Sequence, residues 1–314
     1  MNKHQRNSPL ICDPNEGICE ITHTTNNTEN VGERPIKKAI RITYFTDPIC
    51  SSCWGIEPQL RKLKLEYGDF FEIEYKMGGL LPDWNYNRGG ISKPSDVAHH
   101  WDEVSQYYEM PIDGNIWIED PLHSSYPPSI AFKAAQRQDS KKAIAFLRRI
   151  REMVFMEKKR ITKWEYLEQA AIATGLDVIK LKADFEGKAQ QDFKEDLFQT
   201  QAFEVQGFPT FFFNDDFGNQ YIVLGFKPYQ HFERAILNLL PNAQKKKIDT
   251  DFHTVFEYYP TLTSKEYALL TDTSVSEAEK LLYTYYRQNM LDKIEIKNGI
   301  LWVKKTEDYK LKST

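Results

Sequence analysis

The chain has 314 residues and an apolar content of 41%, which is enough for a sizeable core and suits two domains better than one. Its formal net charge of −4 gives no whole-chain attraction to nucleic acid or acidic lipid. No apolar run approaches the length of a bilayer span, and the polar segment Met1–Ile21 lacks the apolar stretch of a signal peptide. We therefore expect a cytoplasmic protein with no membrane partner.

The first 37 residues hold few apolar side chains, and residues 24–30 are typical of a mobile linker. We predict a flexible N-terminal arm over residues 1–37. Cys12 and Cys19 lie in this arm, separated by a segment in which Asp-Pro and glycine predict a turn. Such a turn would bring the two thiols together, either as an auxiliary redox or disulfide pair or as an exposed pair without a function.

A strand, a helix and a second strand follow in order, predicted over 39–46, 52–67 and 70–77 from their apolar periodicity. This βαβ order predicts two parallel strands. Cys50 falls at the start of the helix, where free backbone N–H groups and the helix dipole stabilise a thiolate. Cys53 lies one turn deeper on the same face. This spacing is the geometry of thiol–disulfide exchange, in which one sulfur attacks and a second resolves the mixed disulfide.

A long helical tract at about 92–204 separates this unit from a later β region. Its predicted helices, interrupted by extended segments at 117–121 and 124–128, are 95–108, 129–138, 140–155, 162–175, 177–186 and 188–203. After it, residues 205–210 lead into a strand at 211–213. A turn at 214–219, a strand at 221–224 and a helix at 229–240 complete the region.

A Lys-rich linker at 241–249 precedes a separate pattern at about 250–306. Helices are predicted over 252–258, 264–270 and 275–290, followed by a hairpin around Asn298-Gly299. Three helices and a two-stranded ribbon predict a small winged-helix-like domain. Its third helix mixes acidic and basic side chains, whereas a helix that reads DNA is surrounded by Lys and Arg. We therefore expect no nucleic-acid partner.

Three features occur together: Cys-x-x-Cys at a strand–helix junction, a late Gly-Phe-Pro-Thr before a strand, and a final hairpin with a helix. Over roughly residues 38–240 the chain resembles the DsbA family of thiol–disulfide oxidoreductases, in particular its FrnE-like branch. The segments that carry the resemblance are Thr46–Gly55, Met77–Leu80 and Trp117–Pro127. The resemblance implies an α/β thioredoxin fold with an inserted helical subdomain at about 92–204.

The resemblance also implies roles for single residues. Cys50 is then the attacking thiolate, Cys53 the resolving thiol, and Pro209 a cis-proline, a rare conformation even before proline. The backbone of Phe208 would pair with an extended substrate peptide by strand addition. Substrate-binding positions implied in this way are Phe208, Trp54, Gly207 and Thr210. A buried carboxylate often serves proton transfer in such proteins, and Glu57 is a candidate for that role.

The alternatives for Cys50 and Cys53 are a structural pair or a zinc site, and a zinc site could combine them with Cys12 and Cys19 as a set of four thiolates. The six residues between Cys12 and Cys19 are a long gap for a zinc knuckle. We therefore expect no metal. For the exchange chemistry we expect no cofactor besides the redox-active disulfide itself, with glutathione as the alternative.

The main hypothesis is a thiol–disulfide oxidoreductase or isomerase that acts on protein substrates through Cys50-Ser51-Ser52-Cys53. The two-domain layout also resembles the Spx adaptor family, whose members present a regulator protein to the ClpXP protease. In that family the cysteines can be altered without loss of the adaptor role. A third alternative is a glutathione-dependent isomerase or transferase relative. Those proteins tend to carry serine at the position of Cys50, which argues against this alternative.

Overall fold

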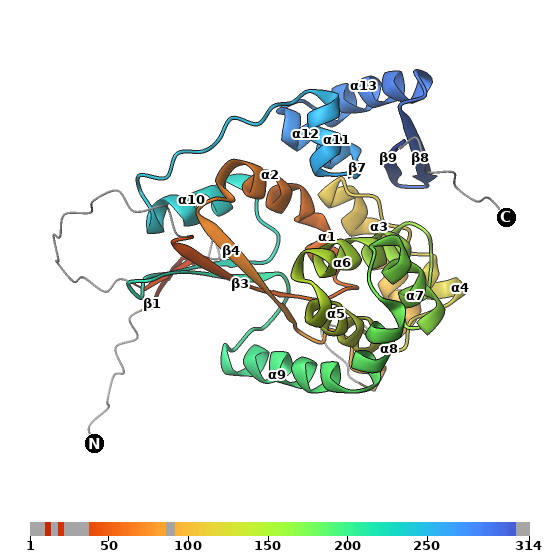
Figure 1. Ribbon diagram of the computed structural model, residues 1–314, viewed down its shortest axis with the longest axis horizontal. Coiled ribbons are helices and arrows are strands. Elements are labelled where there is room, and N and C mark those ends of the chain that lie inside the picture. Colours follow the sequence, from red (N-terminus) through yellow and green to blue (C-terminus); the bar gives the residue numbers. More distant parts are fainter. Residues whose placement is uncertain (1–9, 14–17, 22–37, 86–91, 306–314) are drawn as a thin grey trace.

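The computed structural model describes residues 38–85 and 92–305, and the backbone of residues 10–13 and 18–21 (Figure 1). The strands are β1 (Leu10–Asp13), β2 (Ile18–Ile21), β3 (Ile40–Thr46), β4 (Phe71–Met77), β5 (Thr210–Asp215), β6 (Gln220–Leu224), β7 (Thr261–Thr263), β8 (Leu291–Ile296) and β9 (Gly299–Lys304). The helices are α1 (Ser51–Gly55), α2 (Glu57–Tyr67), α3 (Pro94–Tyr108), α4 (Ile116–Glu119), α5 (Tyr126–Gln138), α6 (Ser140–Phe155), α7 (Trp164–Ala173), α8 (Val178–Glu186), α9 (Lys188–Ala202), α10 (Tyr229–Leu239), α11 (Phe252–Tyr258), α12 (Ser264–Thr271) and α13 (Val275–Arg287).

The main sheet has six strands in the order β1-β2-β6-β5-β3-β4. Strands β3 and β4 are parallel, which confirms the predicted βαβ unit. Strand β5 pairs with β3, and β6 pairs with β5, both in antiparallel fashion. This arrangement of β3–β6 is the thioredoxin fold. It places the end of β3, just before Cys50, beside the start of β5, because Phe45 pairs with Thr210.

Helices cover both faces of the sheet. Successive side chains of a strand point to opposite faces, so Tyr44 and Phe211 face α2 and α10, whereas Phe45 and Phe212 face the end of α9. Figure 1 shows α2 and α10 on one side of the sheet and α9 on the other. The sheet is thereby held between two apolar layers.

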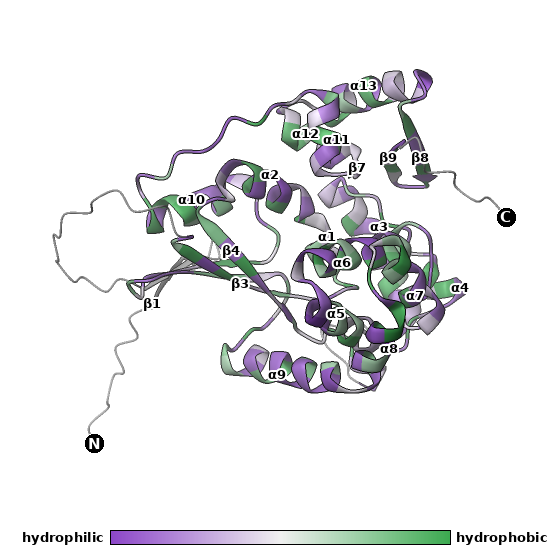
Figure 2. Ribbon diagram, viewed as in Figure 1, coloured by the Kyte–Doolittle hydropathy of each residue, from purple (hydrophilic) through white to green (hydrophobic). Residues whose placement is uncertain are grey.

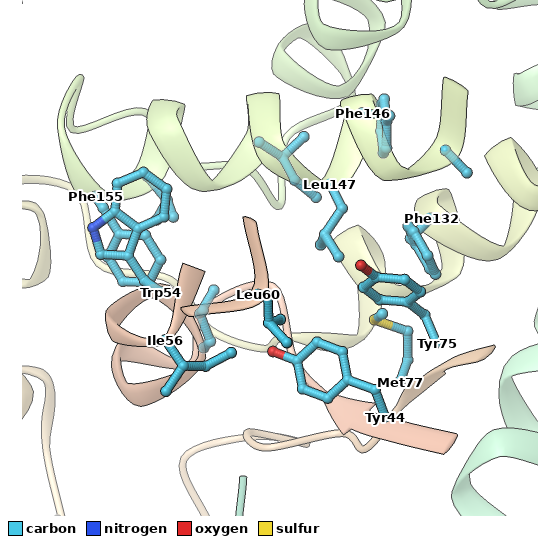
Figure 3. Close-up of a cluster of buried hydrophobic side chains, with 14 of the residues drawn as sticks. Tyr44, Trp54, Ile56, Leu60, Tyr75, Met77, Phe132, Phe146, Leu147 and Phe155 are labelled. Carbon is cyan, nitrogen blue, oxygen red and sulfur yellow. The ribbon is translucent and has the colours of Figure 1, made fainter. Parts of the chain in front are cut away.

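The helices α3–α9 are inserted between β4 and β5, as the sequence predicts. They share one apolar core with the sheet, because side chains of α5 and α6 pack against those of α1, α2 and the strands (Figure 3). The residues labelled in this cluster are Tyr44, Trp54, Ile56, Leu60, Tyr75, Met77, Phe132, Phe146, Leu147 and Phe155. The insertion is therefore part of the same packed body as the thioredoxin unit.

The local structure differs from the predictions in two helical regions. The helix predicted over 52–67 is broken at Ile56 into α1 and α2, because Pro58 has no N–H to donate to the carbonyl of Trp54. The segment 117–121, predicted to be extended, overlaps the helical turn α4. Helix α5 starts at Tyr126, with two prolines in its first turn, where proline costs no hydrogen bond.

Part of the predicted flexible arm belongs to the sheet. Strands β1 and β2 form an antiparallel hairpin that pairs with β6 at the sheet edge. In this register Cys12 lies directly opposite Cys19. The rest of the arm, including the predicted linker at 24–30, lies outside the described residues.

The C-terminal region comprises α11–α13 and a three-stranded sheet in the order β7-β9-β8. The predicted hairpin is present, but Lys297 and Asn298 form its turn and Gly299 already begins β9. Strand β7 is an addition to the predicted two-stranded ribbon. The winged-helix assignment and the domain boundaries stay predictions. The segment that connects α10 to this region is mostly hydrophilic (Figure 2). Among the described residues, no helix is both long enough and apolar enough to cross a bilayer.

Candidate active site

Cys50 and Cys53 form a disulfide at the start of α1, with their Cα atoms 5.1 Å apart. Cys50 is the N-cap of α1, and its sulfur accepts a hydrogen bond from the backbone N–H of Cys53 at 3.0 Å. Cys53 is fully buried and Cys50 is 4% exposed. When the disulfide is reduced, the same N–H and the helix dipole are placed to stabilise a thiolate on Cys50.

The loop before β5 lies close to this disulfide. The peptide bond between Phe208 and Pro209 is cis. Thr210 closes the loop by donating its hydroxyl hydrogen to the Gly207 carbonyl at 2.8 Å, and Gly225 donates its N–H to the Pro209 carbonyl at 2.8 Å. These contacts hold the loop from both sides.

The two segments line one groove of about 630 Å³. Cys50, Ser51 and Ser52 contribute to it from the disulfide side, and Gly207 and Phe208 from the cis-proline loop. Other lining residues come from the segment after β4, from the helical insertion and from the segment after α9; among them are Gly78, Leu80, Trp84, His100, Trp117, Leu197 and Glu204. The groove thus has apolar and polar walls beside Cys50 and is large enough for an extended peptide segment.

Two of the residues predicted to bind substrate do not face this groove. Trp54 is fully buried, donates its indole N–H to the Pro111 carbonyl at 3.0 Å, and packs its ring on Phe155 and under Arg148. Thr210 is buried in β5 and acts on the loop rather than on a ligand. Trp54 is a core residue because α1 directs its side chain toward the helical insertion.

Asp47 is a component of the site that the sequence analysis missed. Its carboxylate is fully buried and accepts hydrogen bonds from the N–H groups of Ile49 and Leu80 and from the Ser125 hydroxyl. Burial raises the pKa of Asp47 to about 6, although these hydrogen bonds and the charge of Arg151 oppose the shift. Its own carbonyl accepts the N–H of Cys50 at 3.2 Å. In the sequence, Asp47 before proline indicated only the end of a strand.

Glu57 is committed to an ion pair. Its carboxylate accepts a hydrogen bond from Arg151 at 2.6 Å and lies 4.0 Å from Arg61. Arg151 is fully buried and also donates to the Thr46 hydroxyl and the Asp47 carbonyl. The Glu57 carboxylate is thus engaged by two arginines, and the contacts described for it include neither Cys50 nor Cys53, so its proton-transfer role stays a prediction.

For the second cysteine pair, Cys12 and Cys19, the structure describes only the backbone pairing. Cys19 is paired with Ile222 of β6 as well as with Cys12. The four-thiolate zinc alternative depends on these two side chains, which lie outside the description. Within the residues whose side chains are described, no three His, Cys, Asp or Glu gather as metal ligands would.

Known proteins resemble this chain in sequence over most of its length. The family model described as Thioredoxin matches residues 44–234. The chain is 34% identical over 297 residues to the ClpXP adapter protein SpxH of Halalkalibacterium halodurans, an alignment that covers 93% of this chain and 96% of that protein.

Two solved structures share the fold. One is a protein from Nitrosomonas europaea provisionally named a protein disulfide isomerase, with a TM-score of 0.57, 18% identity, and coverage of 65% of this chain and 98% of that one. The other is the cytosolic disulfide reductase DsbM from Pseudomonas aeruginosa, with a TM-score of 0.52, 21% identity, and coverage of 63% and 99%. The near-full-length relative includes the C-terminal region as well as the thioredoxin unit. The chain therefore belongs to the thioredoxin-fold family that includes the ClpXP adapter protein SpxH.

Proposed function

We propose that this chain is an adaptor that presents a regulator protein to the ClpXP protease. The observation that carries the proposal is the extent of the similarity to the Halalkalibacterium halodurans adapter, which covers 93% of the chain. The two structures named for disulfide chemistry cover only 65% and 63% of it. The similarity to the adapter therefore extends well beyond the part shared with those two structures. An adaptor for this protease would work in the cytoplasm.

The C-terminal region has surface features that suit protein contact. Tyr258 is 59% exposed, and Leu281 and Tyr286 are 40% and 38% exposed. Tyrosine is enriched at protein interfaces and among the residues that contribute most of the binding energy. These residues are candidates for partner contact in the adaptor role.

The test is a degradation assay with purified ClpXP and the regulator that such adaptors present. The chain is expected to accelerate degradation of the regulator, and the Cys50→Ser/Cys53→Ser variant is expected to do so equally well. Degradation of an unrelated ClpXP substrate serves as the control and should not change. If the wild-type chain leaves the regulator's half-life unchanged, the adaptor proposal fails.

A second function, thiol–disulfide exchange on protein substrates, is favoured by the geometry at Cys50. In this proposal the Cys50 thiolate attacks a substrate disulfide and releases one substrate thiolate. The Cys53 thiol then attacks Cys50, so that the substrate leaves as a dithiol and the Cys50–Cys53 disulfide forms. The substrate gains two electrons and the protein loses two. The groove at Cys50, with the backbone of Phe208 on one side, would hold the substrate peptide.

No dissociable cofactor is needed for this exchange, and glutathione is the candidate thiol for restoring the reduced pair. Reduction of insulin by the wild-type chain and by Cys50→Ser tests the activity. The variant should lose it, because no attacking thiolate remains at the groove. Retained activity in the variant would rule out Cys50 as the nucleophile.

A further inference from the structure

A cluster of buried charged side chains lies between the thioredoxin unit and the C-terminal region. Each of its side chains is at most 15% exposed. Its members are three arginines and three glutamates: Arg61, Arg148, Arg151, Glu57, Glu152 and Glu266. Their formal charges balance, as a buried set of ions requires.

Glu266 is the contribution of α12 to this cluster. Its carboxylate accepts two hydrogen bonds from Arg148, at 2.6 and 3.0 Å, and lies 3.2 Å from Arg61. It also accepts the N–H of Thr263 at 2.7 Å and so completes the N-terminal cap of α12. Burial alone would raise the pKa of Glu266, but the two arginines hold it below its ordinary value. Glu266 is therefore ionised and supplies a fixed negative charge.

The arginines that Glu266 neutralises lead back to the disulfide along two routes. Arg148 lies over the ring of Trp54, 4.4 Å from its centroid, and Trp54 directly follows Cys53. Arg61 lies 4.0 Å from Glu57, which binds Arg151 at 2.6 Å. Arg151 in turn donates to the Asp47 carbonyl that accepts the N–H of Cys50.

We infer that Glu266 is a positioning residue for the redox site, and that its charge limits how strongly the buried arginines stabilise a thiolate on Cys50. This inference rests on the exchange activity proposed above for Cys50 and Cys53. According to this inference, the position of the C-terminal region affects the equilibrium between the reduced cysteines and the Cys50–Cys53 disulfide. By linkage, a partner that shifts α12 changes that equilibrium, and the redox state changes the affinity for that partner by the same factor.

The direction in which each substitution shifts the stability of the Cys50 thiolate follows from the charge balance of the cluster. Removal of the negative charge at Glu266 leaves the arginines in excess, which stabilises the Cys50 thiolate. A more stable thiolate favours the reduced pair and makes the disulfide a stronger oxidant. Loss of the Arg148 charge leaves the glutamates in excess and should have the opposite effect.

The experiment measures two quantities on the full chain in a Cys12→Ser/Cys19→Ser background. These are the pH titration of the Cys50 thiolate by its ultraviolet absorbance, and the equilibrium of the Cys50–Cys53 disulfide with dithiothreitol. Glu266→Gln should lower the thiol pKa and shift the equilibrium toward the reduced pair by about 2- to 30-fold, the usual range for coupling through a contact network. Arg148→Met should shift both quantities the other way, and it keeps the test valid if Glu266→Gln does not fold.

Three further variants separate charge from structural damage. Arg148→Met/Glu266→Gln restores the balance and should return the equilibrium toward the wild-type value. Glu266→Asp keeps the charge and should stay near wild type. Glu277→Gln removes the corresponding cap glutamate of α13, which has no arginine partner among the contacts described, and should change neither quantity.

A failure of this inference can be distinguished from a failure of the proposed exchange function. A wild-type chain that exchanges with dithiothreitol but fails to reduce insulin contradicts the exchange function on proteins and leaves the coupling open to measurement. If Glu266→Gln and Arg148→Met shift the equilibrium in the same direction, or not at all, the coupling by charge is overturned.

Discussion

The ring of Phe208 fills the space that a side chain at position 78 would occupy. A Cβ atom built on Gly78 would lie 2.0 Å from two ring carbons of Phe208. Gly78 also donates its N–H to the Thr46 carbonyl at 2.7 Å, at the end of β3. The absence of a side chain at this glycine thus lets the cis-proline loop approach the segment that carries Cys50.

Substitution of Gly78 by alanine should push Phe208 out of this position. We expect the free energy of unfolding to fall by about 1–3 kcal/mol, the usual cost of overpacking. Insulin reduction should fall as well, because the loop that faces Cys50 is displaced. Urea denaturation and the insulin assay measure the two effects. Gly207→Ala is the control for stability, since a Cβ there would meet nothing within 4 Å. Equal stability losses in the two variants would contradict this account.

Cys53→Ser should trap substrate on Cys50. The variant keeps the attacking sulfur but lacks the thiol that resolves the mixed disulfide. Incubation with a disulfide-bonded protein should give a covalent adduct at Cys50 that mass spectrometry identifies and dithiothreitol releases. Cys50→Ser should give no adduct in the same experiment. An adduct with Cys50→Ser, or none with Cys53→Ser, would argue against the assigned order of the two sulfurs.

Trp54→Phe should reduce stability and leave substrate binding intact. Phenylalanine keeps an aromatic ring on Phe155 but leaves the Pro111 carbonyl without the indole N–H. An unsatisfied buried acceptor costs about 1–3 kcal/mol. Denaturation curves should show this loss, whereas the KM for insulin should stay within experimental error, because Trp54 is not among the residues that line the groove. By contrast, Trp84→Ala alters the groove and should raise the KM for a protein substrate. A raised KM in Trp54→Phe would instead support the predicted contact between Trp54 and the substrate.

Asp47 should make stability depend on pH between about 4 and 6. Its pKa is raised from 3.8 to about 6 in the folded protein, so in this interval the folded state holds a proton that the unfolded state has lost. The free energy of unfolding should therefore fall as the pH rises through this window, by at most about 3 kcal/mol. Asp47→Asn should remove this part of the pH dependence. Denaturation series at several pH values measure it, with the exposed Asp216→Asn as the control. An unchanged slope in Asp47→Asn would show that Asp47 ionises normally.

Features that depend on neighbouring residues could be predicted from the sequence. The position of Cys50 at a helix start follows from a strand, a turn and a helix that are contiguous in the chain. The parallel pairing of β3 and β4 and the hairpin β8–β9 follow from similarly short segments. The approach of Phe208 to Cys50 required the family resemblance, because residues 50 and 208 are far apart in the chain.

The burial of Trp54, the environment of Asp47 and the charge cluster were decided by tertiary packing. Helical periodicity places Trp54 on a face of α1 but does not say which other segment covers that face. Asp47 becomes buried because Leu80 and Ser125 close over it. Arg148 and Glu266 meet although they are 118 positions apart. Local sequence therefore determined where the two reactive sulfurs lie on the chain. Only long-range contacts decided which charges surround them, because a buried charge is stable only where distant segments bring its partner.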